Sequence, residues 1–486
     1  MSKPPPSLRS IGAVLLAIAC ASPLQSADRE TLGAALEQVA RKIPIQSPGV
    51  SIQIADEETG DVVFERSPDA AQTIASITKL ITTATALHYL GPDYKFKTTF
   101  WRRGEIRDGA LVGSLLVVGG GDPNISGRFY GDDINAVFDR WAEGLLQAGV
   151  HRVVGDVLVN ASFFDSVGRH PDWKPDQEAR WYQAPISALS YNDNVVLVSI
   201  HPGPRAGRPA GVSIEPAVDI LRPVALARTV GQRGRVRVAV SRAAGSNAVT
   251  VSGTVPLRPA SWSTPITIDD PPMFFGKALQ NRLRNAGIPV TGQVVEKPVK
   301  PDSSWLAVAA TESDLLPTIE VCNKRSQGFY AEQIFKTVSA EKTGQGTWAG
   351  SVVLAKEFLG GLGLDPARFQ LHDGSGLSTA NRTAAVDLVK FLRAMDRQPY
   401  AEAWRSTLAI SGEGEGTLRH RLNDPLTRGQ ILAKTGSLER VSTLAGYARA
   451  SSGRTYVFAI LFNGRVPNGG GHAIEDQLLR ALIANG

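Results

Sequence analysis

The chain has 486 residues, 43% of them hydrophobic, a composition typical of a globular protein with two or three domains. Its 52 lysines and arginines outnumber its 46 aspartates and glutamates, giving a net charge of +6 without any long basic run. The composition excludes fibrous and disordered classes and does not indicate nucleic-acid binding. A mild attraction to anionic surfaces is compatible with this charge.

Residues 1–27 have the layout of an export signal: basic residues, an apolar run from Ile11 to Ala21, and then small and polar residues. The apolar run is too short to cross a bilayer as a helix. Cleavage is expected after Ala21 or Ala27, and a lipoprotein signal at Cys20 is the less favoured alternative. No second long apolar segment follows. We therefore expect an exported protein, periplasmic or associated with the cell envelope, without a transmembrane anchor.

The first elements of the mature chain are a helix over Thr31–Lys42 and a hairpin over Val50–Glu65. Apolar residues at helical spacing from Ile77 to Leu87 then predict a buried helix, ended by Gly91-Pro92. Ser76 lies at the N-terminal end of this helix, where the helix dipole favours a developing negative charge.

From about residue 96 to residue 266 the pattern changes to short strands and many turns, which predicts a β-rich insertion. Beyond it, helices are predicted over Met273–Asn285, Phe329–Ser339, Ala384–Met395 and Ala473–Ala484, with strands over Leu432–Thr435, Leu444–Ala448 and Thr455–Phe462. The last helix carries Glu475 and Asp476 on its polar face, so it fits a core helix better than a membrane anchor. Peripheral membrane contact stays open.

Two short motifs carry the strongest indication of chemistry. Ser76-Ile77-Thr78-Lys79 gives a nucleophile and a base one helical turn apart, and a serine hydroxyl needs such a base to accept its proton. Lys434-Thr435-Gly436 gives a cationic, hydroxyl-bearing strand edge, where Gly436 leaves room for an anionic acyl donor. Either motif alone also fits an ordinary helix start or strand end, so the hypothesis depends on the pair.

Together the motifs predict a site for acyl transfer. Ser76 is the predicted nucleophile and Lys79 the general base, which burial and a nearby cation would keep neutral. Lys434 and Thr435 are the predicted binders of a substrate carboxylate. The N–H groups of Ser76 and Ser437 would form an oxyanion hole.

Other kinds of site are less well supported. The seven histidines show no metal-binding spacing, so neither a metal nor a cofactor is expected. His372 and His420 lack the G-x-S-x-G turn that accompanies a Ser-His-Asp triad. Cys322 follows apolar residues and is interpreted as a buried filler. Arg419 and Arg421 are interpreted as solvated or structural, with a role in carboxylate binding left open.

Five stretches, the first of which contains the motif Ser76–Lys79, resemble one known family. They are Ala75–Leu80, Gly119–Pro123, Leu189–Asn194, Asp373–Ser378 and Gly416–Arg419. With them the chain resembles the D-alanyl-D-alanine carboxypeptidase/endopeptidases, the low-molecular-mass class C penicillin-binding proteins of the peptidase S13 group. The 358 positions between Ser76 and Lys434 suit a transpeptidase-like domain split by large insertions, whereas a compact β-lactamase has a shorter gap.

The resemblance implies an α+β fold: a β-lactamase/transpeptidase-like domain, with mixed helices around an antiparallel sheet, split by a β-rich insertion of two nested domains. On this basis residues 28–95 form the first part of that domain and residues 267–486 its second part. Residues 96–266 form the insertion, with the nested domain at roughly residues 200–250.

The middle motif of the family is Ser-x-Asn, and here the matching positions are Ser326-Gln327-Gly328. The resemblance assigns Ser326 as a proton relay to the leaving amine. Gly328 lacks the amide that orients the lysine and the substrate, a loss worth on the order of 10²-fold in rate unless Gln327 or a water substitutes. A literal Ser-x-Asn at Ser190-Tyr191-Asn192 is the alternative, but its phrase fits the inserted domain. The loop holding Asp373 and Ser375 is interpreted as a tight turn that supports the site.

The resemblance implies a serine D,D-carboxypeptidase that cleaves D-Ala-D-Ala stem peptides of peptidoglycan through an acyl-serine intermediate and is acylated by β-lactams such as penicillins. Activity as a D,D-endopeptidase is a further expectation. The alternative is a catalytically impaired peptidoglycan- or penicillin-binding protein, because of Gly328. A β-lactamase or esterase of the same fold is disfavoured by the long insertion.

Overall fold

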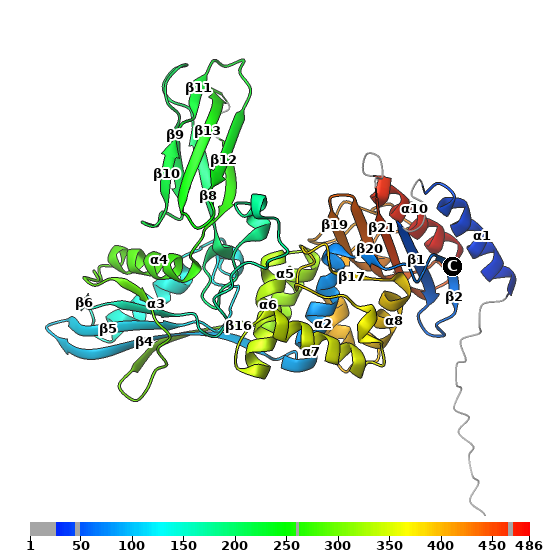
Figure 1. Cartoon of the computed structure of the whole chain (residues 1–486), viewed down its shortest axis with the longest axis horizontal. Coiled ribbons are helices and arrows are strands. Elements are labelled where there is room, and N and C mark those ends of the chain that lie inside the picture. The colour runs from blue at the N-terminus through cyan, green and yellow to red at the C-terminus, as the bar shows by residue number, and fades with distance from the viewer. Residues whose placement is uncertain (1–25, 44–48, 259–261, 465–469) are drawn as a thin grey trace, which may run out of the picture.

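The computed structural model describes residues 26–43, 49–258, 262–464 and 470–486. The molecule is elongated: one end is built from both ends of the chain, and the other end from its middle (Figure 1). Most of the expected export signal, with Cys20 and the cleavage position after Ala21, lies outside the described residues, whereas Ala27 falls in the first helix.

The end of the molecule built from both chain termini is organised around a six-stranded antiparallel sheet in the order β18-β19-β20-β21-β1-β2. β1, from the N-terminal part, pairs with β21, from the C-terminal part, so that Val50 lies opposite Phe462. The strands are β18 (Ala409–Ile410), β19 (Ile431–Leu438), β20 (Val441–Arg449), β21 (Thr455–Asn463), β1 (Val50–Asp56) and β2 (Val62–Arg66).

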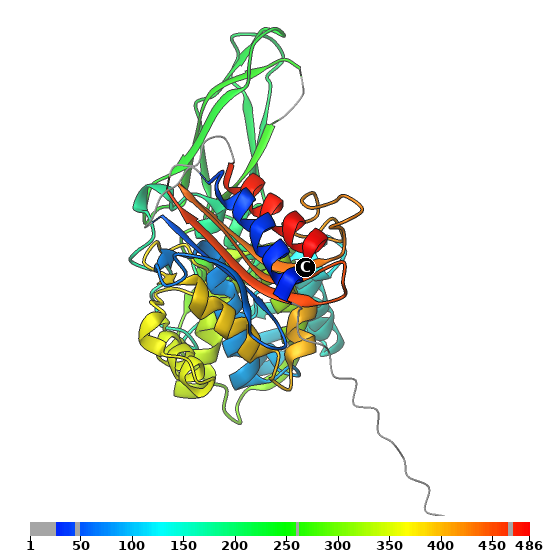
Figure 2. The same ribbon diagram turned by 90° about the vertical axis from the view of Figure 1, so that its right-hand side faces the viewer.

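Helices cover both faces of this first sheet. α1 (Ser26–Ala40) and α10 (Gly470–Asn485) lie side by side on one face (Figure 2). Ile474, Leu478, Leu479 and Leu482 of α10 are buried there, which confirms that this helix belongs to the core. The other face carries α2 (Thr78–Leu90), α5 (Leu315–Lys324), α6 (Gly328–Thr343), α7 (Trp348–Gly361), α8 (Ala385–Met395) and α9 (Ala401–Ser406). In the described part of the chain, no helix is long and apolar enough to cross a membrane.

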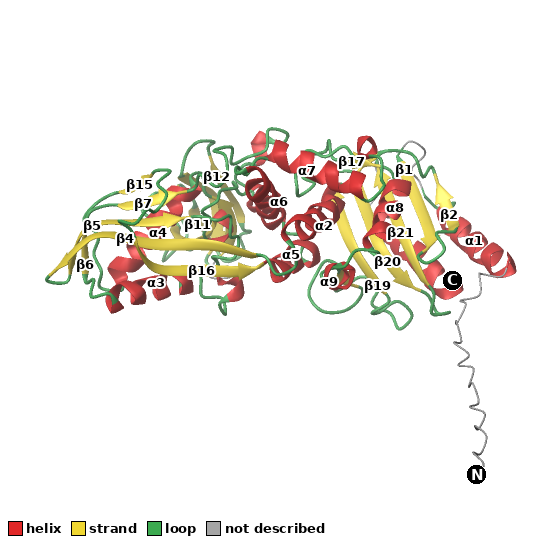
Figure 3. Cartoon of the chain, turned by 90° about the horizontal axis from the view of Figure 1, so that it is seen from below, coloured by secondary structure: helices red, strands yellow, loops and turns green. Residues whose placement is uncertain are grey.

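A second sheet occupies the far end of the molecule, beyond α2, α5 and α6 (Figure 3). Its order is β15-β7-β5-β4-β16, with β6 also paired to β5. Its elements, with the two helices that pack against it, are β4 (Lys95–Arg107), β5 (Ala110–Val118), α3 (Ala136–Gln147), β6 (Arg152–Val154), β7 (Val157–Asn160), α4 (Pro271–Asn285), β15 (Val294–Glu296) and β16 (Leu306–Asp314).

This sheet extends past the boundary that we expected at residues 266 and 267. β16 pairs with β4 along its length, and Phe274 and Leu279 of α4 share a core with Val157. The chain therefore returns to the first sheet and its helices at α5, after Asp314. The sequence did not indicate this, because strand pairing between residues some two hundred positions apart leaves no local pattern.

A β-strand module, residues 195–267, projects from the second sheet (Figure 1). It contains a three-stranded sheet, β14-β8-β9, and a four-stranded sheet in which β10, β11 and β12 all pair with β13. Its strands are β8 (Val195–His201), β9 (Gly211–Glu215), β10 (Arg222–Ala225), β11 (Arg228–Val230), β12 (Arg237–Arg242), β13 (Ala248–Pro256) and β14 (Trp262–Thr267). The paired strands of this module run from residue 195 to residue 267. They therefore extend beyond both ends of the nested domain that we expected at roughly residues 200–250.

Candidate active site

Ser76 lies in a single 3-10 turn, Ala75–Ile77, directly before α2, rather than within the helix itself. Ala75 has a φ of +48°, a left-handed conformation that non-glycine residues rarely adopt. The Thr78 hydroxyl donates to the Ala75 carbonyl oxygen over 2.9 Å. This strained turn presents Ser76, which is partly exposed, while the residues on both sides of it are buried.

Lys79 is in the first turn of α2, and its Nζ donates to Ser76 Oγ over 2.9 Å. The same Nζ donates to the Ser375 carbonyl oxygen over 2.5 Å. Burial lowers the pKa of Lys79, and the negative potential of Cys322, Asp373 and Glu332 opposes that shift. The lysine is therefore well placed to accept the serine proton.

Lys434, on β19, is fully buried and donates to Ser326 Oγ over 2.8 Å and to the Thr435 carbonyl oxygen over 2.8 Å. Burial and the positive charge of Lys79 lower the pKa of Lys434 well below its usual value. Thr435 donates its hydroxyl hydrogen bond to Thr417 Oγ1 over 2.8 Å. These contacts tie Lys434 to Ser326 and Thr435 to Thr417, and Ser326 lines the same cavity as Ser76 and Lys79.

Gly436 allows β19 to lie against the turn that carries Ser76. A Cβ at this position would stand 2.3 Å from Thr443 Oγ1, 2.8 Å from the Ile74 carbonyl oxygen and 3.1 Å from the Ser76 amide nitrogen. We expected Gly436 to leave room for a substrate carboxylate, but the contacts show that it leaves room for the backbone before Ser76. The glycine thus brings the next residue, Ser437, to the same cavity as Ser76.

The loop from Asp373 to Gly376 is rigid because its buried polar atoms are hydrogen-bonded. Asp373 accepts hydrogen bonds from the Gly376 amide (2.7 Å), the Asn381 side chain (2.7 Å) and the Trp173 indole (2.9 Å). A Cβ on Gly376 would meet the Ala75 carbonyl oxygen at 1.8 Å, so the loop touches the turn that carries Ser76. These contacts fit the predicted supporting turn.

The Glu332 side chain of α6 fixes the other side of this loop. It accepts from the amides of Gly374 (2.9 Å) and Ser375 (2.7 Å) and from the Trp348 indole (2.7 Å). Burial, followed by the charge of Asp373, raises the pKa of Glu332 to about 7. Glu332 therefore holds the Ser375 carbonyl oxygen where Lys79 meets it.

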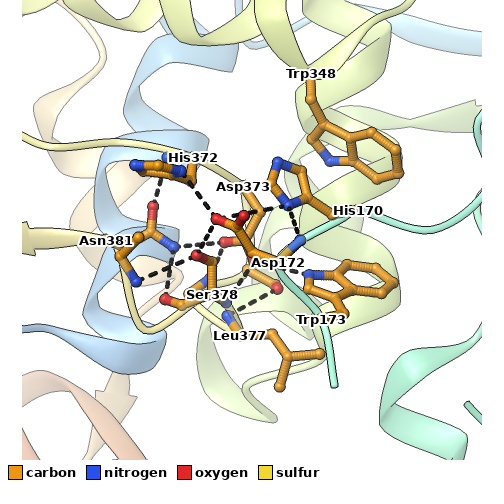
Figure 4. A network of polar contacts seen from close by, with 12 residues as sticks. His170, Asp172, Trp173, Trp348, His372, Asp373, Leu377, Ser378 and Asn381 are labelled. Atoms are coloured by element: carbon orange, nitrogen blue, oxygen red, sulfur yellow. Dashed lines mark hydrogen bonds and ion pairs between the residues drawn. The ribbon is translucent and has the colours of Figure 1, made fainter. Parts of the chain in front are cut away.

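The inserted segment is tied to the same loop by a polar network (Figure 4). Asp172 accepts from the Ser378 hydroxyl over 2.7 Å and lies 2.9 Å from His372 Nδ1. His170 lies on the other side of the Asp172 carboxylate, at 3.9 Å. These contacts hold the stretch after residue 170 beside Ser76, although the two are almost a hundred residues apart in sequence.

A cavity of about 510 Å³ opens at this point. From the two motifs and the loop it is lined by Ser76, Lys79, Ser326, Gly328, Ser375, Gly376 and Ser437. From the inserted segment it is lined by Asp172, Lys174, Gln177, Trp181, Tyr182 and Gln183. Lys434, Thr435 and Gln327 are not among the lining residues, so Lys434 reaches the cavity through Ser326.

Comparison with known proteins identifies the chain. A sequence profile of the D-Ala-D-Ala carboxypeptidase 3 (S13) family matches residues 32–484. The chain belongs to this carboxypeptidase family. A D-alanyl-D-alanine carboxypeptidase from Actinomadura sp. (strain R39) is 32% identical over 90% of the chain and 81% of that relative. These matches confirm the resemblance seen in the motifs and identify an enzyme of the D-alanyl-D-alanine carboxypeptidase class.

Solved structures confirm the fold expected of this S13 carboxypeptidase. Penicillin-binding protein 4 from Haemophilus influenzae has a TM-score of 0.78 at 21% identity and covers 92% of this chain and 98% of its own. The same protein complexed with a β-lactam has a TM-score of 0.74 at 20% identity, with the same shares covered. A penicillin-binding-protein fold with inserted strands is thus shared.

At the position matched to the asparagine of Ser-x-Asn, this S13 chain has Gly328, and the structure shows how much space surrounds it. Gly328 begins α6, and a Cβ there would make ordinary contacts, 3.6 Å from Ser375 Cβ and 3.7 Å from the Tyr182 carbonyl oxygen. The position therefore has space for a side chain. The alternative Ser190-Tyr191-Asn192 lies away from this cavity, where the Ser190 hydroxyl bonds to Ser187, Asn194 and Gln333.

Sequence reasoning missed most of the cavity wall of this carboxypeptidase. Lys174, Trp181 and Tyr182 come from short 3-10 turns and loops in the insertion, and no motif marks them. Glu332 was also missed, because α6 carries several other polar residues, such as Gln333 and Lys336, and nothing local distinguishes this glutamate from them. Arg421 pairs with Glu475 and Asp476 of α10, so its role is structural, which was one of the two interpretations from the sequence. Cys322 is buried, as expected.

Over the described residues, no group of three or more histidine, cysteine, aspartate or glutamate side chains is arranged to hold a metal ion.

Proposed function

We propose that the protein is a serine D,D-carboxypeptidase that removes the terminal D-alanine from D-Ala-D-Ala stem peptides of peptidoglycan. The observation that carries the proposal is the 2.9 Å contact between Ser76 Oγ and the Nζ of the buried Lys79 at the wall of a 510 Å³ cavity. Membership of the S13 family gives the reaction class. The side chains around the cavity support a path for the proton from Ser76 to the leaving amine.

In the acylation step, neutral Lys79 accepts the proton of Ser76 as Oγ attacks the carbonyl carbon of the penultimate D-alanine. Burial favours the neutral amine, which is the form that can act as a base. The negative charge that forms on the substrate oxygen is stabilised by the N–H groups of Ser76 and Ser437. The closeness of β19 to the Ser76 amide, which Gly436 permits, supports this oxyanion hole.

Breakdown of the tetrahedral intermediate breaks the C–N bond, and the departing D-alanine amine needs a proton. Ser326 is the proposed donor, since its Oγ lines the cavity and accepts a hydrogen bond from Lys434. The proton that Lys79 accepted from Ser76 is passed on to Ser326 Oγ, where it replaces the proton given to the amine and leaves Lys79 neutral. Water then attacks the acyl-serine with Lys79 again as base, which releases the shortened peptide and restores Ser76.

Thr435 and Lys434 are the proposed binders of the substrate carboxylate. The Thr435 hydroxyl now donates to Thr417 Oγ1 over 2.8 Å, and a substrate carboxylate would replace Thr417 as the acceptor. Lys434 would act at longer range, because it is fully buried. Acylation by β-lactams follows from the same chemistry, since they present a reactive carbonyl beside a carboxylate. Endopeptidase activity and export to the periplasm or cell envelope are part of the proposal.

The second candidate is a peptidoglycan- or penicillin-binding protein with impaired turnover. It is favoured by Gly328, where the family has an asparagine that positions the base and the substrate. The two candidate functions differ in how fast the acyl-serine is hydrolysed and the peptide released. They do not differ in the attack of Ser76 on the substrate.

The test is acylation of the mature protein by a fluorescent penicillin, with release of D-alanine from a D-Ala-D-Ala peptide measured in the same samples. We expect the wild type to be labelled and to release D-alanine. We expect Ser76→Ala to do neither. Labelling with release of no more than about one D-alanine per protein molecule would favour the impaired binding protein. Absence of labelling of the folded wild type would overturn the site.

Gly328→Asn separates the two candidates further, because the position has space for the side chain. If the wild type is impaired, Gly328→Asn is expected to raise kcat for D-alanine release by about 10-fold or more. Gly328→Ala is the control, since it adds a Cβ without an amide. Equal kcat values for the wild type and both variants would show that the missing amide does not limit turnover.

A further inference from the structure

The β-strand module, residues 195–267, carries a charge unlike that of the rest of the chain. It contains nine arginines, no lysine and two acidic residues, which gives +7, whereas the whole chain has a net charge of +6. The remaining residues are therefore close to neutral in sum. The net positive charge of this protein therefore comes from one projecting module, although most of its lysines and arginines lie elsewhere (Figure 1).

Within the module the arginines gather at the distal end. Arg205 and Arg208 lie between β8 and β9, Arg228 begins β11, and Arg233, Arg235 and Arg237 lie in or beside the turn from β11 to β12. Hydrogen bonds bring these stretches together: the Thr229 amide donates to the Arg208 carbonyl oxygen, and the Gly203 amide donates to Thr229 Oγ1.

The strand registers agree with this placement. Arg228 and Arg237 lie on either side of Thr254, near the end of β13, and Arg258 follows that strand. We call this group of seven arginines the arginine tip. The two acidic residues lie elsewhere: Glu215 is paired with Leu197, near the start of β8, and Asp219 follows β9.

The arginines of the tip are all exposed, and none of them forms an ion pair with another described residue. Arg242, also in the module, shows the contrast: its side chain is buried and bonds to the Thr267 carbonyl oxygen and to Asp269. One arginine of the module thus has a structural role, and the tip arginines have no partner that would explain their accumulation.

Exposed aliphatic side chains lie among these arginines. Leu226, two residues before Arg228, is 60% exposed, and Val236, between Arg235 and Arg237, is 37% exposed. Arginine binds phosphate groups, whereas an exposed leucine is stabilised by removal from water. A surface that offers both phosphates and hydrocarbon matches this combination, and a lipid bilayer is such a surface.

We propose that the arginine tip docks the protein on the surface of a membrane rich in anionic phospholipids. An anionic wall polymer would satisfy the arginines but would give Leu226 and Val236 no apolar environment. The segment at residues 175–183, which lines the catalytic cavity, contacts the opposite end of the module, where Arg180 is bridged to Ile266. The nine-residue strand β13 spans about 30 Å, so docking at the tip would hold the cavity roughly that far above the lipid.

The test is co-sedimentation of the mature protein with vesicles of phosphatidylcholine alone and of phosphatidylcholine mixed equally with phosphatidylglycerol. We expect binding to the anionic vesicles only, and loss of that binding at high salt. The triple variant Arg233→Gln, Arg235→Gln, Arg237→Gln is expected to lower the partition coefficient about 100-fold, since each basic residue near an anionic surface contributes about 5-fold.

The matched control is Arg152→Gln, Arg284→Gln, Arg449→Gln, which removes the same charge from exposed arginines outside the module. It should bind anionic vesicles within a few-fold of the wild type. Acylation by fluorescent penicillin, unchanged in both triple variants, reports that each is folded. Equal binding by the two triple variants would overturn the proposal, as would equal binding to neutral vesicles, or binding to purified peptidoglycan without binding to vesicles.

Discussion

Among single residues, Gly436 allows β19 to lie against the turn that carries Ser76, and an added methyl group would meet Thr443 Oγ1 at 2.3 Å and the Ile74 carbonyl oxygen at 2.8 Å. We expect Gly436→Ala to lower the rate constant of penicillin acylation by about 100-fold or more, because Ser437 would move away from Ser76. Gly361→Ala is the control, since a Cβ there meets nothing within 4 Å. Similar acylation rates for the two variants would contradict the packing argument.

Lys79 gives a second prediction, from its lowered pKa. A lysine acts as a base only when neutral, so the acylation rate should rise with pH as Lys79 loses its proton. Because burial lowers the pKa of Lys79, the midpoint should lie below the usual value of 10.5 for lysine. Stopped-flow acylation by a chromogenic β-lactam across pH measures this midpoint. A rate that stays flat until the pH of ordinary lysine ionisation would speak against Lys79 as the base.

At the scale of elements, the turn at Gly119–Pro123 is held by a buried carboxylate. Asp122 accepts from the Asn124 amide over 2.8 Å and from the Ser313 hydroxyl over 2.7 Å, and so ties the turn to the end of β16. Burial raises the pKa of Asp122 from 3.8 to about 6. The native state therefore holds this proton up to a higher pH than the unfolded state does.

Because the native state keeps the proton of Asp122 up to a higher pH, the contribution of Asp122 to the free energy of unfolding falls as pH rises. The contribution of Asp122 is fully present below pH 3.8 and decreases until about pH 6, by an amount on the order of 3 kcal/mol. We expect Asp122→Asn to gain stability relative to the wild type as pH rises through this window. Urea unfolding of both proteins at several pH values measures it. A difference between the two proteins that does not change with pH would refute the assignment.

In the overall fold, the cavity beside Ser76 exists because the inserted segment is folded against the first sheet and its helices. Trp181 lines the cavity from the insertion, 45% exposed, and faces the wall that holds Ser76. Trp181→Ala is expected to lower kcat/KM for a stem peptide about 10-fold, because a long peptide contacts both walls.

Acylation of the Trp181→Ala variant by a small β-lactam should change much less, because such a ligand fills only the region around Ser76. Leu306→Ala, an exposed residue on β16, is the control for the peptide reaction. Steady-state release of D-alanine and penicillin labelling are measured side by side. Equal losses with the peptide and with the β-lactam would mean that Trp181 acts on folding or on Ser76 rather than on the peptide.

From its motifs and its family resemblance, the amino-acid sequence predicted the class of enzyme and the class of fold, and the comparisons confirm both. Ser76 and Lys79 are linked by helical spacing, a local rule, and Lys434-Thr435-Gly436 has the pattern of a strand edge, so both motifs could be found without coordinates. The helices with clear apolar periodicity were also found, to within a few residues at their ends. Family resemblance supplied the assignment of Ser326, which no local rule gives.

The contacts between these motifs and the rest of the site are visible only in the tertiary structure. The contact of Ser326 with Lys434, the Ser375 carbonyl oxygen beside Lys79 and the closing of the cavity by Trp181 join residues separated by a hundred positions or more. Such contacts depend on packing and strand pairing across the whole chain, which leave no periodic signal in any one segment. The concentration of arginines at one tip became visible for the same reason, once the strand registers brought four separate stretches together.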